Sequence, residues 1–467
     1  MGPVLTERNH HSMATARRGS RDLTQGNIAK ELILFSLPIF AGQIFQNLYN
    51  SVDSIVVGQA IGTTALAAVS ASADISMLLT GFFVGFSTGG GVLIARYFGA
   101  KEQDNLEKAL HTLVSFGIII GLSMATLGII LSPALLRLVK CPDDVFPEAL
   151  AYLRIYLIGV LFTAIYNVGS RILQSVGDSR RPFYYLVISS ITNIIMDVLF
   201  VVVLRLGVIG AALATIISQG LSVTMVYVRM LRTDDVYRLH PKRLLHMDGQ
   251  MLKEIAILGF PAAIQSSLIS ISNLFVQRYI NSFGSSAMAG IGAAKKIDRF
   301  VGMIAQSLGL ATTTFVSQNV GAKKYDRAFK GIRTALLICA IYILSVGTLV
   351  YTLAEFFVNI FISEEAAVAF GVSMVHWMLP FYYFQCLNNI FANAVRGFGK
   401  SLVVMVCSVV GMIGCRQLFL FVAMKLNYSV INVYVAFPVG WACAALAVMI
   451  YYFIKIRPRY SAKKTEE

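Results

Sequence analysis

The sequence predicts an all-α polytopic membrane protein with twelve transmembrane helices in two six-helix bundles. Three observations support this fold class: little charge, twelve long apolar runs, and an uneven distribution of basic residues among the loops. Only 13% of the 467 residues are charged and 57% are hydrophobic, whereas soluble domains average about 25% charged residues. This composition excludes a cytosolic enzyme, a secreted domain and a disordered protein.

The apolar runs define the predicted spans. A bilayer core about 30 Å thick needs about 20 apolar residues per helix. The predicted spans are 32–56, 64–95, 110–133, 148–170, 183–204, 207–228, 254–279, 286–317, 333–355, 368–392, 402–424 and 430–454.

The basic residues predict the topology. Of 39 lysines and arginines, 29 lie in the two tails and the even-numbered loops, and five lie in the odd-numbered loops. Cytoplasmic loops collect Lys and Arg, so both termini are predicted to be cytoplasmic. The net charge of +15 therefore reflects topology, and we expect no nucleic-acid partner. The six cysteines show no metal-ligand spacing, and buried free thiols are expected.

The chain contains an internal repeat. Gly99-Ala100-Lys101 recurs as Gly321-Ala322-Lys323, and Asn167 recurs as Asn389 at the same offset. Near the start of each half, Pro38 recurs as Pro261 at an offset that is longer by a single position. A constant offset across several helices indicates two copies of one six-helix unit.

The repeat sets the predicted organisation of the chain. The predicted parts are a cytoplasmic tail, an N-terminal lobe, a cytoplasmic linker, a C-terminal lobe and a second cytoplasmic tail: 1–29, 30–229, 230–252, 253–454 and 455–467. An even number of spans makes the halves parallel, related by a pseudo-two-fold axis along the membrane normal, as in some secondary transporters.

Polar residues gather on one face of the first helix. Gln46, Tyr49, Asn50 and Asp53 follow an i, i+3, i+4, i+7 spacing. The first three are also candidates for contact with a substrate.

The fifth and sixth helices add a second polar group. Asn193 and Asp197 share one face of the fifth helix, and Thr215 lies in the sixth. The positions equivalent to Asp53, Asn193 and Asp197 in the second half are Val276, Cys415 and Phe419, so these acids occur only in the N-terminal half.

An aspartate at a helix centre costs about 2.5–3.5 kcal/mol on insertion scales, so its presence indicates a use. Burial raises a carboxyl pKa, and a neighbouring carboxylate raises it further. Asp53 and Asp197 are therefore predicted to bind H⁺, or to form with Asn193 and Thr215 an oxygen site for Na⁺. Simple polar attachment between helices is the alternative.

Several motifs resemble the MATE (multidrug and toxic compound extrusion) family. They are Leu37-Pro38, then Leu48-Tyr49-Asn50 with Val52-Asp53 and Val57-Gly58, and Gly177-Asp178-Ser179-Arg180-Arg181-Pro182. The resemblance covers nearly the whole chain and is closest to the DinF-like and MepA-like bacterial branch. It implies a twelve-helix exporter of the bacterial inner membrane, with a V-shaped pair of bundles, that couples efflux to entry of H⁺ or Na⁺.

The resemblance also implies roles for individual residues. Pro38 matches the helix-bending proline, and Asp53 matches the acid that follows it. Asn193, Asp197 and Thr215 match the cation-coupling residues of the fifth and sixth helices, and Asn167 resembles the fourth-helix asparagine beside them. The acids that NorM-like members carry in the seventh and tenth helices are absent here, so coupling is expected in the N-terminal lobe.

The C-terminal half offers further candidates. Lys295, Asp298 and Arg299 either form a solvated helix end or line the substrate cleft. Arg416 requires a partner or a water-filled cavity within the membrane. Four amides are candidates either for substrate contacts or for links between helices: Gln265, Gln277, Asn388 and Asn389. Met77, Met303 and Tyr382 are weaker candidates for an adaptable binding surface.

Together these features predict an antiporter that exports lipophilic, cationic compounds by alternating access. We expect a monomer in the lipid bilayer, with no enzymatic activity and no cofactor other than the coupling ion. The alternatives are a lipid-linked oligosaccharide flippase of the same superfamily, an intramembrane aspartyl protease and a non-transporting receptor. The protease lacks its Gly-x-Gly-Asp signature, because Ser175-Val176-Gly177-Asp178 has no first glycine.

Overall fold

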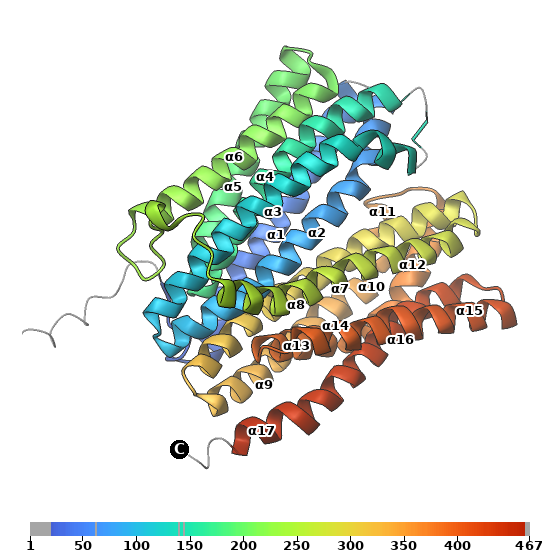
Figure 1. Ribbon diagram of the computed structural model, residues 1–467. Coiled ribbons are helices and arrows are strands. Elements are labelled where there is room, and N and C mark those ends of the chain that lie inside the picture. The colour runs from blue at the N-terminus through green and yellow to red at the C-terminus, as the bar shows by residue number, and fades with distance from the viewer. Residues whose placement is uncertain (1–19, 61–62, 139–140, 143–144, 463–467) are drawn as a thin grey trace, which may run out of the picture.

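All regular secondary structure in the described part of the chain is helical (Figure 1). The computed structural model describes residues 20–60, 63–138, 141–142 and 145–462, and the side chains of residues 53–79 and Leu138 lie outside this description. The N-terminal half, called the N-lobe, has six helices. They are α1 (Ile28–Ala60), α2 (Thr63–Ala100), α3 (Gln103–Leu138), α4 (Phe146–Ser175), α5 (Arg180–Asp197), which continues as π-helix η1 (Val198–Val203), and α6 (Gly207–Arg232).

The C-terminal half, called the C-lobe, follows a linker that contains the short helix η2 (Pro241–Arg243). Its elements are α7 (Gly249–Asn281), α8 (Ser285–Gly321), α9 (Tyr325–Tyr342), η3 (Ile343–Gly347), α10 (Thr348–Thr352), α11 (Ala354–Asn359), α12 (Glu365–Met378), η4 (Leu379–Phe381), α13 (Tyr382–Gly397), α14 (Ser401–Val409), η5 (Val410–Cys415), α15 (Arg416–Leu426), α16 (Val430–Tyr451), η6 (Tyr452–Ile456) and α17 (Arg457–Ala462).

Eleven helices within the described residues are long and apolar enough to cross a membrane. They match eleven of the twelve predicted spans, and the twelfth, 64–95, falls on α2. The prediction of an all-α polytopic membrane protein is therefore confirmed. Several helices are longer than predicted: α4 continues past the expected end at 170 to Ser175, and α13 continues to Gly397 rather than 392.

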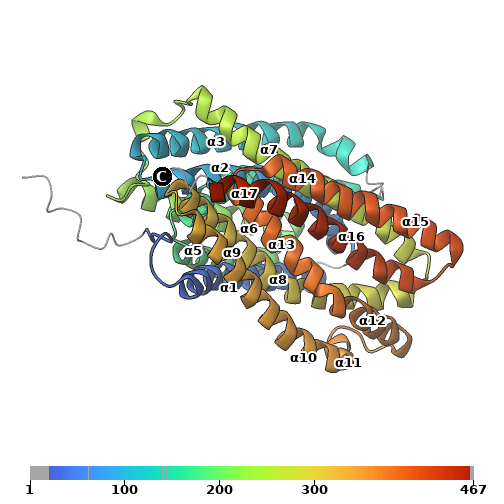
Figure 2. The same cartoon turned by 90° about the horizontal axis from the view of Figure 1, so that it is seen from below.

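The first helix of each lobe begins against the other lobe. Leu32 and Phe35 of α1 are buried in a core with Phe315 of α8. Met251 and Ile255 of α7 are buried in a core with helices of the N-lobe. This reciprocal exchange ties the two bundles together at the end of the molecule that holds the α6–α7 linker and α17, called the linker end (Figures 1 and 2).

A symmetric helix crossing closes the linker end. A Cβ added at Gly99 would lie 1.9 Å from the Gln318 carbonyl oxygen, and one at Gly321 would lie 1.9 Å from that of Arg96. Both pairs follow the sequence repeat, since Arg96 corresponds to Gln318 and Gly99 to Gly321. The glycines of the repeated Gly-Ala-Lys motif thus permit α2 and α8 to approach backbone to backbone near the pseudo-two-fold axis.

The segment 20–26, called the strap, crosses the same end between the lobes. On the N-lobe side, Arg21 N donates to the Val176 carbonyl oxygen at 2.9 Å. On the C-lobe side, Leu23 is 1% exposed and its N–H donates to Gln318 Oε1 at 2.9 Å. Gln318 Nε2 in turn donates to the Ser175 carbonyl oxygen at 2.9 Å. One glutamine therefore joins the strap, α4 and α8.

Candidate functional site: a polar cavity in the N-lobe

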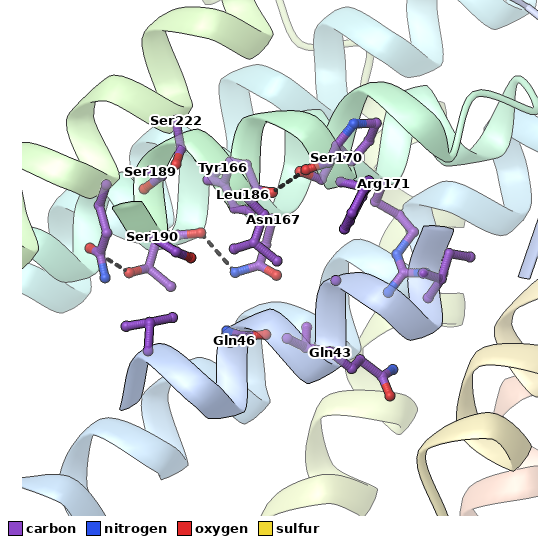
Figure 3. A pocket seen from close by; sticks show the side chains of 18 of the residues that line it. Gln43, Gln46, Tyr166, Asn167, Ser170, Arg171, Leu186, Ser189, Ser190 and Ser222 are labelled. Atoms are coloured by element: carbon purple, nitrogen blue, oxygen red, sulfur yellow. Dashed lines mark hydrogen bonds between the residues drawn. The ribbon is translucent and has the colours of Figure 1, made fainter. Parts of the chain in front are cut away.

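A cavity of about 260 Å³ lies mainly between α1, α4, α5 and α6 of the N-lobe, with residues of α2 and Leu310 of α8 also in its wall (Figure 3). Most of its lining consists of hydroxyl and amide side chains with a minority of apolar ones. The lining residues are Pro38, Ile39, Gly42, Gln43, Gln46, Tyr49, Thr80, Val84, Thr163, Tyr166, Asn167, Ser170, Arg171, Gln174, Ser179, Pro182, Phe183, Leu186, Ser189, Ser190, Asn193, Thr215, Ser218, Gln219, Ser222 and Leu310.

Six residues selected from the sequence line this cavity. They are Pro38, Gln46, Tyr49, Asn167, Asn193 and Thr215. The structure therefore brings the helix-bending proline, part of the first-helix polar face and three of the proposed cation-coupling residues to one place. Asn50, on the same face of α1, is exposed and does not line the cavity.

The deepest polar group is on α5. Asn193 is 1% exposed, and neither its Oδ1 nor its Nδ2 has a hydrogen-bond partner among the described residues. One turn further along, Asp197 is 0% exposed, and the helix changes to the π-helical η1 directly after it. A buried amide with free hydrogen-bonding capacity beside a buried carboxyl is costly for the fold, so the pair indicates a site for a cation or a polar ligand.

Thr215 and Asn167 face the same cavity from α6 and α4. Thr215 Oγ1 donates to the Ala211 carbonyl oxygen at 3.0 Å, and Asn167 Nδ2 donates to the Thr163 carbonyl oxygen at 2.8 Å. These bonds fix the donor atoms within their own helices and leave oxygen lone pairs for a ligand. Such oxygens fit Na⁺, which prefers hard donors, and equally fit hydrogen bonds to a protonated carboxyl.

The side chains of two sequence candidates, Asp53 and Met77, lie outside the described part of the structure. Their backbones belong to α1 and α2. α1 continues as one helix through Pro38. Proline removes one backbone hydrogen bond and crowds the preceding turn, so Pro38 places the weakest point of the α1 hydrogen-bond ladder at the cavity wall.

The C-lobe candidates do not line the cavity. Gln265 belongs to a hydrogen-bond chain between helices: its Nε2 donates to Ser408 Oγ at 2.9 Å, and its Oε1 accepts from Arg396 Nη2 at 3.0 Å. Asn388 and Asn389 are partly buried on α13. The structure therefore places Gln265 in contacts that link helices.

The eighth helix holds a second group of charges. Lys295 Nζ donates to Gln277 Oε1 at 2.9 Å, and the Tyr382 hydroxyl donates to Asp298 Oδ1 at 2.5 Å. Lys295 and Asp298 are partly buried, whereas Arg299 is exposed. Met303, on the same helix, is 3% exposed. Of Lys295, Asp298 and Arg299, only Arg299 therefore fits the expectation of a solvated position.

Arg416 is sealed inside the C-lobe. It is 2% exposed, its Nη2 donates to Ser272 Oγ at 2.6 Å, and its guanidinium lies 5.6 Å from the centre of the Phe437 ring. Gln417 Nε2 donates to the same Ser272 Oγ at 2.8 Å. The partners that the sequence did not identify are therefore a serine hydroxyl and an aromatic face.

The Gly177-Asp178 motif is structural. Gly177 has φ +88°, and a Cβ there would lie 2.1 Å from the Arg21 carbonyl oxygen of the strap. Asp178 accepts from Arg181 N at 3.1 Å and pairs with Arg181 Nη1 at 2.6 Å. Burial raises the pKa of Asp178, against the opposing effect of Arg181. Gly177 and Asp178 thus start α5 and hold the strap in place, while Ser179 and Pro182 of the same motif line the cavity.

Most of the lining residues were not selected from the sequence, and Arg171 is the charged one among those described. Arg171 lies on α4, and its side chain reaches toward α1 (Figure 3). The predicted fourth span ends at 170, so Arg171 was counted with the loop. Its spacing from Asn167 and Gln174, i+4 and i−3, places all three on one helix face, which was the available signal.

A family profile described as MatE matches the chain twice, over residues 38–199 and 261–422. The chain belongs to the MATE family. The two matches begin at Pro38 and Pro261, which the repeat in the sequence already pairs. With this assignment the protein is a membrane transporter of the multidrug-efflux type.

Individual relatives agree with the family. The chain is 29% identical over 392 residues to the probable multidrug resistance protein YpnP of Bacillus subtilis, covering 83% of this chain and 87% of that one. It is 29% identical over 433 residues to YoeA of the same organism, also a probable multidrug resistance protein, covering 91% and 94%. The fold matches that of a MOP superfamily transporter from Pyrococcus furiosus with a TM-score of 0.87 and 22% identity, covering 96% and 99%.

Proposed function

We propose that this MATE protein is an antiporter that exports lipophilic small molecules carrying a cationic group, in exchange for H⁺ or Na⁺. The observation that carries the proposal is the N-lobe cavity, because the buried Asn193 lines it and the buried Asp197 lies one turn away. The difference between the lobes supports the proposal too, since the C-lobe residues equivalent to Asn193 and Asp197 are Cys415 and Phe419.

The proposed cycle uses the residues at the cavity in named roles. Asp53 and Asp197 take up the cation, and Asn193, Thr215 and Asn167 supply oxygen ligands or hydrogen bonds. Neutralisation of the carboxylates favours bending of α1 at Pro38, which narrows the cavity and displaces the substrate. A membrane potential of 100 mV adds about 2.3 kcal/mol for each net charge moved.

We propose further that both termini and the linker end face the cytoplasm of the bacterial plasma membrane. The distribution of lysine and arginine supports this orientation. The glycine crossing and the strap close the linker end, so the arrangement corresponds to a state in which substrate cannot enter from the cytoplasm. The protein is proposed to work as a monomer.

The test is dye transport in inverted membrane vesicles, with the pH and Na⁺ gradients collapsed separately. Loss of transport under one collapse alone identifies the coupling ion. Asp53→Asn should abolish coupled transport while the protein remains folded by size-exclusion chromatography. Wild-type transport rates in Asp53→Asn would refute the mechanism.

The flippase alternative makes a different prediction in reconstituted vesicles. A lipid-linked oligosaccharide flippase moves a fluorescent lipid-linked sugar between leaflets and leaves a small dye in place. Dye export without lipid movement supports the antiporter, and the reverse result supports the flippase.

A further inference from the structure

The cavity has an uneven charge distribution along its length. Among the described residues that line it, Arg171 is the single Asp, Glu, Lys or Arg. Asp197 and the proposed cation site lie beyond Asn193. Asp53 follows Gln43 on α1 at a distance of about 15 Å along the helix. The Arg171 region therefore carries a positive charge, away from the acids.

Arg171 has no partner of opposite charge among the described residues. The ion pairs between described residues involve five other basic side chains, and no hydrogen bond joins its guanidinium to a described residue. A second cation, Arg396 of the C-lobe, acts on it electrostatically. Arg396 is engaged with Gln265 and Asn393, so it adds positive potential without neutralising Arg171.

The fold positions this arginine. A Cβ at Gly91 of α2 would lie 2.6 Å from Arg171 Cγ and 3.0 Å from its Cδ, so the absence of a side chain at Gly91 makes room for the arginine stem. At the equivalent places of the C-lobe stand Thr313 and Asn393, whose side chains bond to each other at 3.0 Å. Two neutral side chains therefore fill this space in the C-lobe, whereas in the N-lobe it is occupied by the cationic Arg171 side chain, packed against Gly91.

A guanidinium in a membrane protein is unfavourable unless it is paired or hydrated, and it offers two parallel N–H donors that match a carboxylate. Neighbouring amides and hydroxyls such as Gln43, Gln174 and Ser179 also line the cavity and offer further hydrogen bonds to an anion. This arrangement binds an anion better than it binds a second cation.

We propose that Arg171 is a substrate-binding residue that pairs with a carboxylate of the transported molecule. The transported compounds are then zwitterionic amphiphiles, with the anionic group at Arg171 and the cationic group toward the acids of the cavity. This inference rests on the proposed export function and specifies its substrate class.

The test compares two dyes that differ by one group, tetramethylrhodamine with a free carboxylate and its methyl ester. Binding to the purified full-length protein in phosphatidylcholine nanodiscs is measured by fluorescence anisotropy, with empty nanodiscs subtracted. The wild type should bind the acid at least about tenfold more tightly than the ester, the factor expected for a charge-assisted hydrogen bond worth about 1.4 kcal/mol or more. Arg171→Gln should remove this preference by weakening binding of the acid alone.

Two further variants separate recognition from folding. Gly91→Ala keeps the charge and displaces the arginine stem, so it should reduce the preference for the acid. Arg180→Gln removes an exposed arginine outside the cavity and should leave both affinities unchanged.

Equal binding of acid and ester by the wild type would overturn the proposal, as would an equal loss of both dyes in Arg171→Gln. In either case, export of the ester from vesicles would leave the proposed antiporter intact. Failure of export with the preference retained would instead refute the export function.

Discussion

The two lobes share one fold, yet corresponding segments of their helices have opposite surroundings. In the N-lobe, Asn193 faces a cavity with its side-chain atoms unpaired among the described residues. In the C-lobe, the corresponding stretch carries Arg416, which is closed in by Ser272 and Phe437. The N-lobe therefore keeps a polar cavity in this segment, and the C-lobe has closely packed side chains in the corresponding segment.

The largest expected effect is on transport. Asp197→Asn should abolish coupled export, because the amide cannot exchange a proton and provides less charge for Na⁺. Dye transport in inverted vesicles measures this. Phe419→Leu, at the equivalent position of the C-lobe, is the control and should retain most of the activity. Similar losses in both variants would remove the functional distinction between the lobes.

The next largest effect is on the free energy of unfolding, and it should be equal in the two lobes. Gly99→Ala and Gly321→Ala both place a Cβ 1.9 Å from a backbone oxygen of the opposite helix. Each should lower the free energy of unfolding by about 3 kcal/mol, measured by equilibrium unfolding in mixed micelles. Gly220→Ala, where a Cβ meets nothing within 4 Å, should be neutral or stabilising. An effect in only one lobe would contradict a symmetric crossing.

A smaller effect on stability is expected from the packing around Arg416 in the C-lobe. Ser272→Ala removes the acceptor for Arg416 Nη2 and leaves this buried donor unpaired, at a cost of about 2 kcal/mol. Gln417 Nε2 keeps its bond to the Ser272 carbonyl oxygen at 2.9 Å. The same unfolding measurement applies, and dye transport should change less than stability. Ser270→Ala is the matched control, because Ser270 bonds within its own helix, to the Ser266 carbonyl oxygen. Equal stabilities of the two variants would show that Arg416 does not depend on Ser272.

The smallest effect concerns Thr313 and Asn393, which occupy the C-lobe positions equivalent to Gly91 and Arg171. Thr313→Val keeps the side-chain shape and loses the bond to Asn393 Oδ1, which still accepts from Arg396. The expected loss is about 1 kcal/mol of unfolding free energy. Thr334→Val, on an exposed face, should change stability by less than about 0.5 kcal/mol. A loss above that of Ser272→Ala would reverse this ranking.

Most of the fold could be predicted because apolar run length and repeat spacing are local properties of the chain. Polar residues are conspicuous in apolar helices, so the sequence singled out Asn193 and Thr215, which line the cavity, and Asp197, which is buried. Helix ends were harder, because α4 and α13 continue past the bilayer-length run. Arg171 and Arg396 were therefore counted as loop charges.

Tertiary packing also determines which amide side chains line the cavity and which link helices. Gln46 and Gln265 look alike in the sequence, yet one lines the cavity and the other links α7 to Ser408 and Arg396. Nothing local distinguishes them, since the difference depends on the neighbouring helices. The partners of Arg416 were hidden for the same reason.

The strap also affects the order of events during biosynthesis. Its contacts include Arg327 Nε to the Leu23 carbonyl oxygen at 3.3 Å, between residues 304 positions apart. At roughly 5–20 residues per second, synthesis of that interval takes about 15–60 s. The N-lobe helices are complete well before α9 leaves the ribosome. The first described residues of the chain are therefore among the last to reach their final contacts.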